Sequence, residues 1–363
     1  MNAGVPPLLR MVLLVSLLAL LPLAWWWLRQ RGSDAASRLV ALTTLAAFLT
    51  FDLIVFGAFT RLTDSGLGCP DWPGCYGQAS PIAAHAEIHA AQSAQPTGPV
   101  TTTKAWIEMI HRYLAMTVGL LIVVMTAAGW RARRALPHSP WWATATLVWV
   151  ILQGLFGMWT VTLKLNPAIV TLHLLGGVVL LVLLVWQRAS FLDRPLPLPI
   201  GRGAVAAVTG IVTLQVALGG WVSTNYAVLA CPDFPTCAGV WWPEMDFDHG
   251  FTLLRDLGRK ASGEFLPAQA LVAIHFVHRV FAVAAFAALG LLGVALRRAA
   301  LPDARRIGLW LLALAAAQLV TGLSNIVLGW PIVAALLHTA GAAAMVGLLA
   351  SLLWRMAPAE RAR

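Results

Sequence analysis

Two short stretches decide the fold: IEMIHRY at residues 107–113 and IHFVHRV at residues 274–280. Each lies near the start of a long apolar run, so each places an imidazole and a guanidinium where hydrocarbon would surround them. Isolated ionisable groups in a bilayer cost from about 3 to more than 10 kcal/mol, and such residues usually serve a function. The two copies together predict a functional membrane site built from paired His-Arg motifs.

The composition places the chain in a membrane. Of its 363 residues, 59% are hydrophobic and 11% are charged, and the mean hydropathy is +0.77. A soluble domain has charged residues at about a quarter of its positions. The formal charge of +10 does not indicate nucleic acid here, because the basic residues of a membrane protein first report its orientation. We expect an all-α polytopic membrane protein with no nucleic-acid partner.

Nine apolar runs have the length of about 20 residues that crosses a bilayer as a helix. They are 11–28, 39–59, 105–130, 141–163, 168–186, 204–222, 268–296, 307–328 and 332–354. The first run ends in three tryptophans at 25–27 and lacks a clear small-residue cleavage site, so we favour a retained helix over a signal peptide. This extra N-terminal transmembrane helix and its loop are expected to occupy residues 1–37.

The placement of basic residues sets the expected topology. The loops after the first, third, fifth and seventh runs, together with the C-terminus, hold 16 Lys and Arg residues, against 7 on the opposite side. Basic residues concentrate in cytoplasmic loops. We therefore expect a cytoplasmic C-terminus and two long loops outside, at about 60–104 and 223–267.

An internal repeat organises the spans. The strings CPDWPGC at 69–75 and CPDFPTC at 231–237 are 162 positions apart, and the His-Arg motifs are 167 apart. A third set, offset by 165, pairs Gln153 with Gln318, Gly157 with Gly322 and His173 with His338. We expect two pseudo-symmetric four-helix bundles, 38–203 and 204–363, in addition to the first helix.

The repeat turns four histidines into two pairs. His111 and His173 belong to the first half, and His278 and His338 hold the corresponding places in the second. All four are expected near the outer face of the membrane, within about two helical turns of the start of a span. Imidazoles that project inward from a helix bundle are typical cofactor ligands, and haem with two axial histidines fits best.

Other interpretations compete for these residues. A single membrane histidine often does no more than hydrogen-bond across helices, although two symmetry-related pairs disfavour this for all four. A zinc site of His with Cys is a minor alternative, because the cysteines lie in loops and the histidines in helices. In the first outer loop, His85, Glu87 and His89 form either a metal site or, as we favour, a solvated helical turn.

The four cysteines form two closely spaced pairs in the outer loops, Cys69 with Cys75 and Cys231 with Cys237. The outer compartment is oxidising, and five intervening residues that include two prolines can bring the two Cα atoms within bridging distance. We therefore favour two structural disulfides. The alternative is a thiol pair that passes electrons or metal.

The halves differ at one chemically important place. Glu108 occupies the position of His275, and each lies three residues before a ligand histidine, on nearly the same helix face. A carboxylate here either pairs with Arg112 or Arg279, or acts beside a bound substrate ring. In the second role it handles a proton or stabilises positive charge, and this catalytic interpretation is the one we favour.

With these motifs the chain resembles the haem A synthase family over about residues 52–354. The strings that carry the resemblance are GAFTRLTDSGLGCPDWPGCYG, IEMIHRYLA, TLHLLGG, CPDFPTC, HFVHR and LLHTAGA. The resemblance implies an enzyme that oxidises a methyl group of haem O to the formyl group of haem A, by successive hydroxylations and loss of water, for terminal oxidase biogenesis. The family core has eight helices, so the helix in residues 1–37 is a departure.

The same resemblance implies residue roles. His278 and His338 would ligate a resident haem b. His111 and His173 would hold the substrate or product haem, and Glu108 would be the catalytic carboxylate. The setting it implies is a bacterial inner membrane with the haem sites and long loops on the periplasmic side. Lipid, a haem O synthase and an unidentified electron donor would be partners, and a homo-oligomer is allowed.

Without the resemblance, the residues predict a membrane protein with two bis-histidine haem sites. Two alternatives to an enzyme then stay open: a cytochrome that passes electrons between unaltered haems, and a haem transporter that binds haem transiently. The inequality of the halves at Glu108 favours an enzyme, because an electron relay needs no carboxylate beside one ring.

Overall fold

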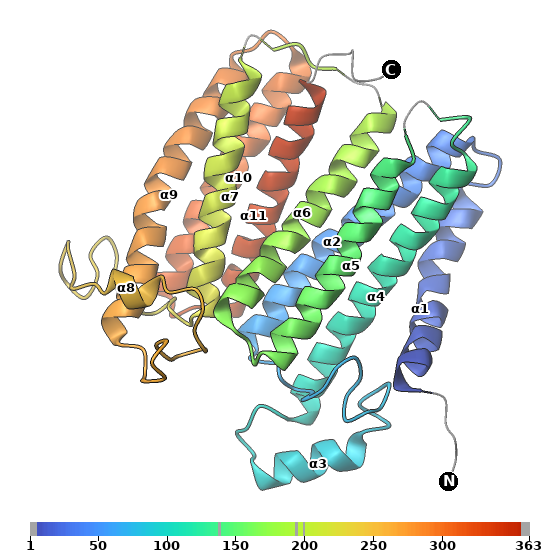
Figure 1. Ribbon diagram of the computed structural model, residues 1–363. Helices are drawn as coiled ribbons and strands as arrows, with labels where there is room; N and C mark the ends of the chain where they lie inside the picture. Colours follow the sequence, from blue (N-terminus) through green and yellow to red (C-terminus); the bar gives the residue numbers. More distant parts are fainter. Residues whose placement is uncertain (1–5, 137–138, 193–194, 199, 357–363) are drawn as a thin grey trace, which may run out of the picture. The chain divides into compact units, whose positions relative to one another are not determined.

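The computed structural model describes residues 6–136, 139–192, 195–198 and 200–356. Over these residues the chain forms eleven α-helices and no strand, and nine of the helices are long and apolar enough to cross a membrane (Figure 1). Spans of 22 to 30 residues are about 33 to 45 Å long, which exceeds the roughly 30 Å of a bilayer core. The predicted all-α polytopic membrane fold is confirmed.

The nine spanning helices of the described residues are α1 (Pro7–Arg29), α2 (Ala35–Leu62), α4 (Thr102–Arg131), α5 (Trp141–Thr162), α6 (Pro167–Leu192), α7 (Arg202–Thr224), α9 (Ala268–Arg297), α10 (Pro302–Val327) and α11 (Ile332–Arg355). Two short helices, α3 (His85–Ala94) and α8 (Phe247–Gly250), lie in the long loops. Helix α3 confirms the helical turn predicted around His85 and His89.

Polar caps and prolines begin several helices earlier than hydropathy indicates. The Asp34 carboxylate precedes α2 and accepts the Ser37 N–H at 2.7 Å, and this hydrogen bond lowers the pKa of Asp34. The Thr101 hydroxyl accepts the Lys104 N–H at 3.2 Å and caps α4. Helix α10 has Pro302 in its first turn, where the missing N–H costs no helical hydrogen bond.

Packing divides the chain into two compact units. The first comprises the residues up to Leu165 together with Leu183–Leu192, so it contains α1 to α5 and the C-terminal part of α6. The second comprises Asn166–Val182 and the described residues that follow Leu192, so it contains the N-terminal part of α6 and α7 to α11. The division at 203/204 inferred from the repeat stays a prediction.

In the first unit, α4 is the central helix, and α1, α2, α3 and α5 pack against it. The extra helix α1 contributes Met11 and Val15 to a buried cluster that also contains Cys69, Cys75 and Met109. Helix α1 therefore covers the first disulfide loop as well as the side of α4.

In the second unit, α7, α9, α10 and α11 form a closed bundle, because α7 packs on α9, α9 on α10, α10 on α11 and α11 on α7 (Figure 1). Helices α9 and α10 approach closely through two glycines. A Cβ atom at Gly308 would lie 2.6 Å from the carbonyl oxygen of Gly293. Only glycine at this position allows that approach.

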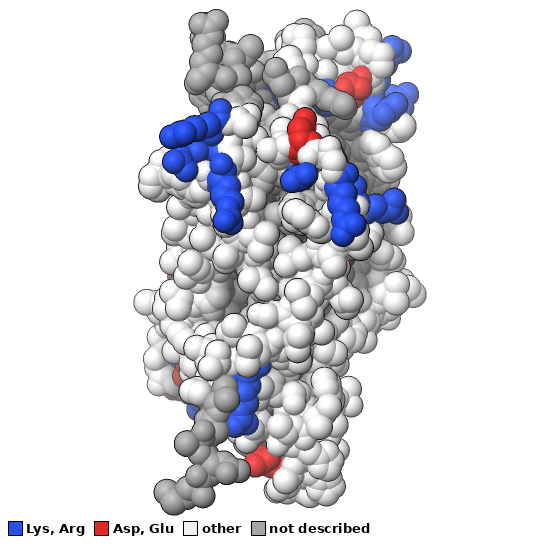
Figure 2. Space-filling view, turned by 90° about the vertical axis from the view of Figure 1, so that its right-hand side faces the viewer, with Lys and Arg blue, Asp and Glu red and all other residues white. Residues whose placement is uncertain are grey.

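Charge is unevenly distributed along the helices. Figure 2 shows one face on which Lys and Arg gather near the upper end, above a broad uncharged band and a sparsely charged lower end. An uncharged band is the surface that lipid tails would cover. Three of the basic residues used to assign the topology, Arg194, Arg361 and Arg363, lie outside the described residues.

Candidate functional site

Glu108 and Arg112 form a buried ion pair near the start of α4. Nη2 of Arg112 donates to Oε1 of Glu108 at 2.5 Å, and the residues are 8% and 4% exposed, respectively. Oε2 of Glu108 accepts the main-chain N–H of Cys69 at 2.8 Å. Both carboxylate oxygens are therefore engaged. The pairing with Arg112 is present, and the catalytic role of Glu108 stays a prediction.

Arg112 also holds the first disulfide loop. Its Nη1 atom donates to the carbonyl oxygens of Asp71, Pro73 and Gly74 at 2.9, 3.1 and 2.5 Å. A guanidinium presents several N–H groups in one plane, so a single side chain can fix several backbone carbonyls. A disulfide joins the two cysteines of this loop, 69 and 75. Helix α4 and the loop are thus tied together near the N-terminal end of α4.

A disulfide between cysteines 231 and 237 closes the corresponding loop of the second half. This loop is held by similar contacts, with one side chain that differs. Arg279 on α9 donates to the carbonyl oxygens of Cys231 and Asp233 at 2.6 and 2.7 Å. Nδ1 of His275 lies 3.3 Å from the Cys231 nitrogen, and its Nε2 lies 3.2 Å from Nε of Arg279. A neutral imidazole has one acceptor nitrogen, so His275 satisfies one of these N–H groups where Glu108 satisfies two.

An aspartate closes each disulfide loop from within. Asp233 accepts the N–H groups of Ala238 and Gly239 at 2.6 and 2.8 Å, and the Thr236 hydroxyl donates to it at 2.5 Å. The hydroxyl contact, followed by the backbone contacts, lowers the pKa of Asp233 from its ordinary value of 3.8. Asp71 holds the corresponding place in the first loop and accepts two N–H groups at 2.6 Å.

Three of the four predicted ligand histidines face a glycine on a neighbouring helix. The pairs are Gly57 with His111, Gly219 with His278 and Gly322 with His338. A Cβ atom added to these glycines would lie 3.1, 3.0 and 3.3 Å from the respective imidazole ring. Any larger residue would crowd the ring, because helix interiors are closely packed. The glycines therefore allow the imidazole rings to lie against the neighbouring helices.

The second-half histidines have polar neighbours. Nε2 of Gln215 donates to the main-chain carbonyl of His278 at 3.1 Å, and Nε2 of Gln318 donates to that of His338 at 2.8 Å. The Gln215 amide also lies 3.1 Å from Nδ1 of His278. The Thr321 hydroxyl lies 3.0 Å from Nδ1 of His338. Each of these histidines is thus contacted at its main chain and at Nδ1.

His173 differs from them at its ring. Its Nδ1 atom is buried and has no hydrogen-bond partner among the described residues. An unsatisfied buried polar atom costs about 1 to 3 kcal/mol. The protein thus holds this imidazole without a hydrogen bond at Nδ1.

His278 on α9 and His338 on α11 belong to the same four-helix bundle of the second unit, and their pairing stays a prediction. His111 belongs to the first unit and His173 to the second. Their pairing therefore stays a prediction.

The residues present fit a haem. Among the described residues, no group of three or more His, Cys, Asp and Glu is placed to hold a metal ion. Two histidines can bind a metal ion whose remaining ligands come from a cofactor. In haem, the porphyrin supplies four nitrogen ligands in a plane. The predicted ligands are imidazoles, the donors that haem iron commonly takes from proteins, and two of them lie on helices of one bundle.

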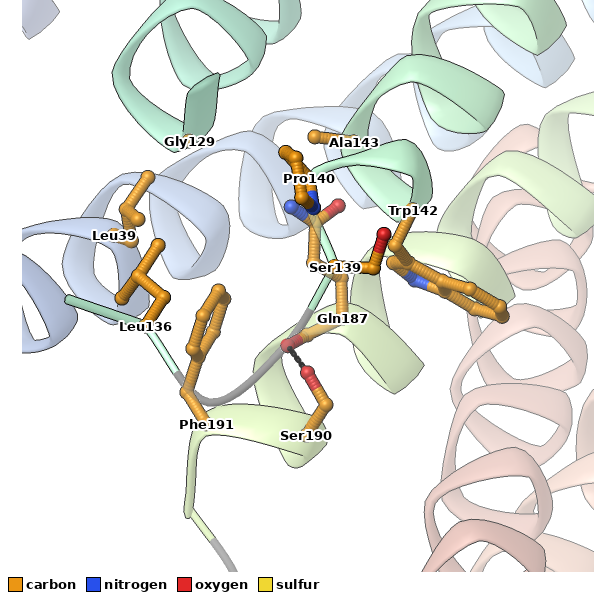
Figure 3. Close-up of a pocket in the computed structure, with 10 residues that line it drawn as sticks. All are labelled: Leu39, Gly129, Leu136, Ser139, Pro140, Trp142, Ala143, Gln187, Ser190 and Phe191. Carbon is orange, nitrogen blue, oxygen red and sulfur yellow. Dashed lines mark hydrogen bonds between the residues drawn. The ribbon is translucent and has the colours of Figure 1, made fainter. Parts of the chain in front are cut away.

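The pocket drawn in Figure 3 is a different feature. Its lining comes from α2, α4, α5 and α6 and includes Leu39, Gly129, Trp142 and Gln187. Gly129 follows His111 by 18 positions on α4, a distance of about 27 Å at 1.5 Å per residue. The pocket therefore lies at the other end of α4 from the ligand histidine.

The repeat singled out Gln318 and Gly322, but sequence reasoning missed Gly57, Gln215, Gly219 and Thr321, which also contact the histidines. Gly57 and Gly219 are 162 positions apart, the same offset as the cysteine motifs, so the repeat contained a signal for them. Thr321 carried no such signal, because the first half has Phe156 at the corresponding position. Its role depends on a neighbour that only the fold provides.

Comparisons with known proteins match most of the chain. The sequence model of the COX15-CtaA family, described as cytochrome oxidase assembly protein, matches residues 41–350. A Shewanella oneidensis protein named Heme A synthase is 37% identical over 327 residues, which cover 85% of this chain and 94% of that protein. Proteins of the same name from Caulobacter vibrioides and Sphingopyxis alaskensis are 28% and 30% identical. They match 89% and 85% of this chain, and 97% and 89% of their own lengths.

Proposed function

The chain belongs to the COX15-CtaA family of cytochrome oxidase assembly proteins, and we propose that it catalyses the reaction after which its relatives are named. It is an oxidoreductase that converts haem O to haem A. The observation that carries this proposal is the 37% identity to a Heme A synthase over 94% of that protein's length. The glycine-faced histidines support it independently, because they fit the class of ligand that the reaction requires.

We assign different haems to the two halves. His278 and His338 bind a resident haem b, and His111 and His173 bind haem O and then haem A. The placement of His278 and His338 on α9 and α11 of one four-helix bundle supports the first pair. The presence of a buried carboxylate in the first half alone supports the second, because chemistry on a ring substituent needs a group that can manage charge.

Glu108 is the catalytic carboxylate in this proposal. It lies three residues before His111 on α4, so the two side chains share a helix face. Its burial at 4% exposure excludes bulk water, Arg112 pairs with one carboxylate oxygen, and the Cys69 N–H fixes the direction of the other. A carboxylate held in this way can stabilise positive charge on a nearby substrate or accept a proton from it. The methyl group is oxidised by successive hydroxylations, and loss of water leaves the formyl group.

The resident haem b supplies one-electron redox chemistry when bound. The surrounding residues supply orientation: Gly219 and Gly322 let the two ligand rings lie against the neighbouring helices, and Gln215 and Gln318 fix the main chain of the ligand helices. The reductant that this oxidation of haem O with oxygen requires is a separate electron donor, and a haem O synthase is the source of substrate.

The proposed setting is a bacterial inner membrane. The disulfide loops and histidines lie on the periplasmic side and the C-terminus lies in the cytoplasm. Support comes from the excess of Lys and Arg in the loops assigned to the cytoplasm, and from the two disulfides, which persist in an oxidising compartment.

The test is haem extraction and typing from protein purified with and without a haem O supply. We expect haem b in both preparations and haem O or haem A only with the supply. Glu108→Gln should retain haem b and lose haem A formation by about 100-fold or more, the usual range for an acid-base group. His278→Ala should lose haem b.

His275→Gln is the matched control, because His275 contacts the second disulfide loop as Glu108 contacts the first. It should leave haem A formation largely intact. Two haem b groups in both preparations, with no conversion under reducing aerobic conditions, would instead indicate an electron-transfer cytochrome. Normal haem A formation by Glu108→Gln would remove Glu108 from the mechanism.

A further inference from the structure

The Thr321 hydroxyl lies between a backbone carbonyl of its own helix and a ring nitrogen of His338. Its oxygen lies 2.8 Å from the carbonyl oxygen of Ala317 and 3.0 Å from Nδ1 of His338. A carbonyl oxygen only accepts, and the hydroxyl has a single proton, so that proton points to Ala317. The oxygen then offers only lone pairs to His338. Nδ1 of His338 must therefore be the protonated nitrogen.

This arrangement leaves Nε2 of His338 unprotonated and free to bind a metal. In metal-binding histidines the second ring nitrogen usually donates to a fixed acceptor, which sets the tautomer, orients the ring and makes the ligand more basic. Gly322, the next residue, lets the ring approach α10: a Cβ there would lie 3.3 Å from Cε1 of His338. Gln318, one turn earlier, holds the main-chain carbonyl of His338.

The first half lacks this arrangement. His173 corresponds to His338, and the residue that corresponds to Thr321 is Phe156, which has no hydroxyl. In agreement with that difference, Nδ1 of His173 is buried without a hydrogen-bond partner among the described residues. The two halves thus differ at the ring nitrogen that tunes the strength of an axial ligand.

We propose that Thr321 is a positioning residue that makes His338 a permanent haem ligand, and that the lack of a counterpart makes His173 an exchangeable one. The inference rests on the proposed function, in which one haem stays and the other enters as substrate and leaves as product. A resident cofactor needs tight ligation, whereas a site that turns over must release its ring. A hydroxyl beside the histidine of the second half, and none beside that of the first, allows tight ligation in one half and release in the other, with histidine as the ligand in both.

The test compares Thr321→Val, which keeps the shape and removes the hydroxyl, with Thr321→Ser, which keeps the hydroxyl. The first readout is the midpoint potential of the resident haem b in the purified protein. A basic axial ligand favours ferric iron, so loss of the hydrogen bond should raise the potential. A tenfold loss of ferric over ferrous affinity corresponds to about 59 mV for one electron. Thr321→Ser should stay near the wild-type value.

The second readout is haem transfer from the detergent-solubilised protein to an excess of apomyoglobin. Wild-type protein loaded with haem O should lose its haems in two phases. His173→Ala should abolish the fast phase and His338→Ala the slow one. Thr321→Val should accelerate the slow phase by about 10- to 100-fold, the usual effect of removing such a partner, and should not alter the fast phase.

Several results would overturn the inference. One is an unchanged potential and slow phase in Thr321→Val, and another is a Thr321→Ser variant that behaves like Thr321→Val. A first-half haem that leaves no faster than haem b would refute the part about His173. These outcomes differ from failure of the proposed function, which would appear in wild-type protein as the absence of haem b or of haem O conversion.

Discussion

Removal of Arg112 should leave the buried negative charge of Glu108 without a partner. Removal of Arg279, the corresponding arginine of the second half, should leave no such charge. In Arg112→Met the apolar stem is replaced by one of similar length, and Glu108 keeps its carboxylate at 4% exposure. Breaking a buried ion pair by removing one partner costs about 3 to 5 kcal/mol. Because about 1.4 kcal/mol is a factor of ten, the disulfide loop at 69–78 should open about a hundred to a few thousand times more often.

Arg279→Met provides the matched control. Arg279 also donates to loop carbonyls, so its loss breaks comparable hydrogen bonds. Its partner His275 is an imidazole that can be neutral, so no charge is stranded. The opening of the second loop should therefore increase by less than that of the first. Glu108→Gln added to Arg112→Met should restore part of the lost stability, because the glutamine is uncharged and can still accept from Cys69 N–H.

Amide hydrogen exchange of the protein in lipid nanodiscs measures both openings, with peptides that cover residues 69–78 and 231–240. Equal increases in the two loops would show that hydrogen bonds, not the ion pair, hold the first one. Failure of Glu108→Gln to recover any protection in the Arg112→Met background would also refute the reasoning, since it would mean that no uncompensated charge was present.

Two further outcomes follow from the site. Gly219→Ala should lower the haem b content, because its Cβ would lie 3.0 Å from Cε1 of His278. The control Gly210→Ala, on the same helix, meets no atom within 4 Å and should keep its haem. Equal haem contents in the two variants would contradict this. The lowered pKa of Asp233 means that its hydrogen bonds stabilise the second loop above pH 3.8 and that this contribution is lost as the pH falls through the folded-state pKa. Pepsin should therefore cleave wild-type protein in this loop increasingly below about pH 4, and Asp233→Asn should show less pH dependence; an identical pH profile would exclude Asp233.

The spans were predictable because lipid imposes a simple requirement: about 20 apolar residues in a row. The residues at which the helices begin were less predictable. Helix α10 begins at Pro302, whereas hydropathy places its start at 307, and α2 begins at Ala35 in place of 39. In each case a polar first turn lowers the average hydropathy of the window but suits a helix N-terminus, where caps and prolines are favoured.

The sequence predicts histidine ligands for the candidate site, and these stay predictions; most of the residues that contact the histidines were not predicted. The repeat identified His278 and His338 because both halves carry a histidine at those positions. The contact of Glu108 with the Cys69 N–H joins residues 39 positions apart, and no local pattern encodes it. Thr321 reaches His338 from another helix, and threonine is common in membrane helices, so the fold was needed to single it out.

The differences between the halves lie beside the histidines, not in them. Where the first half has a carboxylate at Glu108, the second has an imidazole at His275, and where the second has a hydroxyl at Thr321, the first has the ring of Phe156. The first exchange changes the charge near the ligand helix, and the second changes the basicity of an axial ligand. Under the proposed function, these two exchanges let one half retain a haem and the other act on one with the same four predicted ligands. Transfer of the histidines alone between halves would therefore leave the two roles where they are.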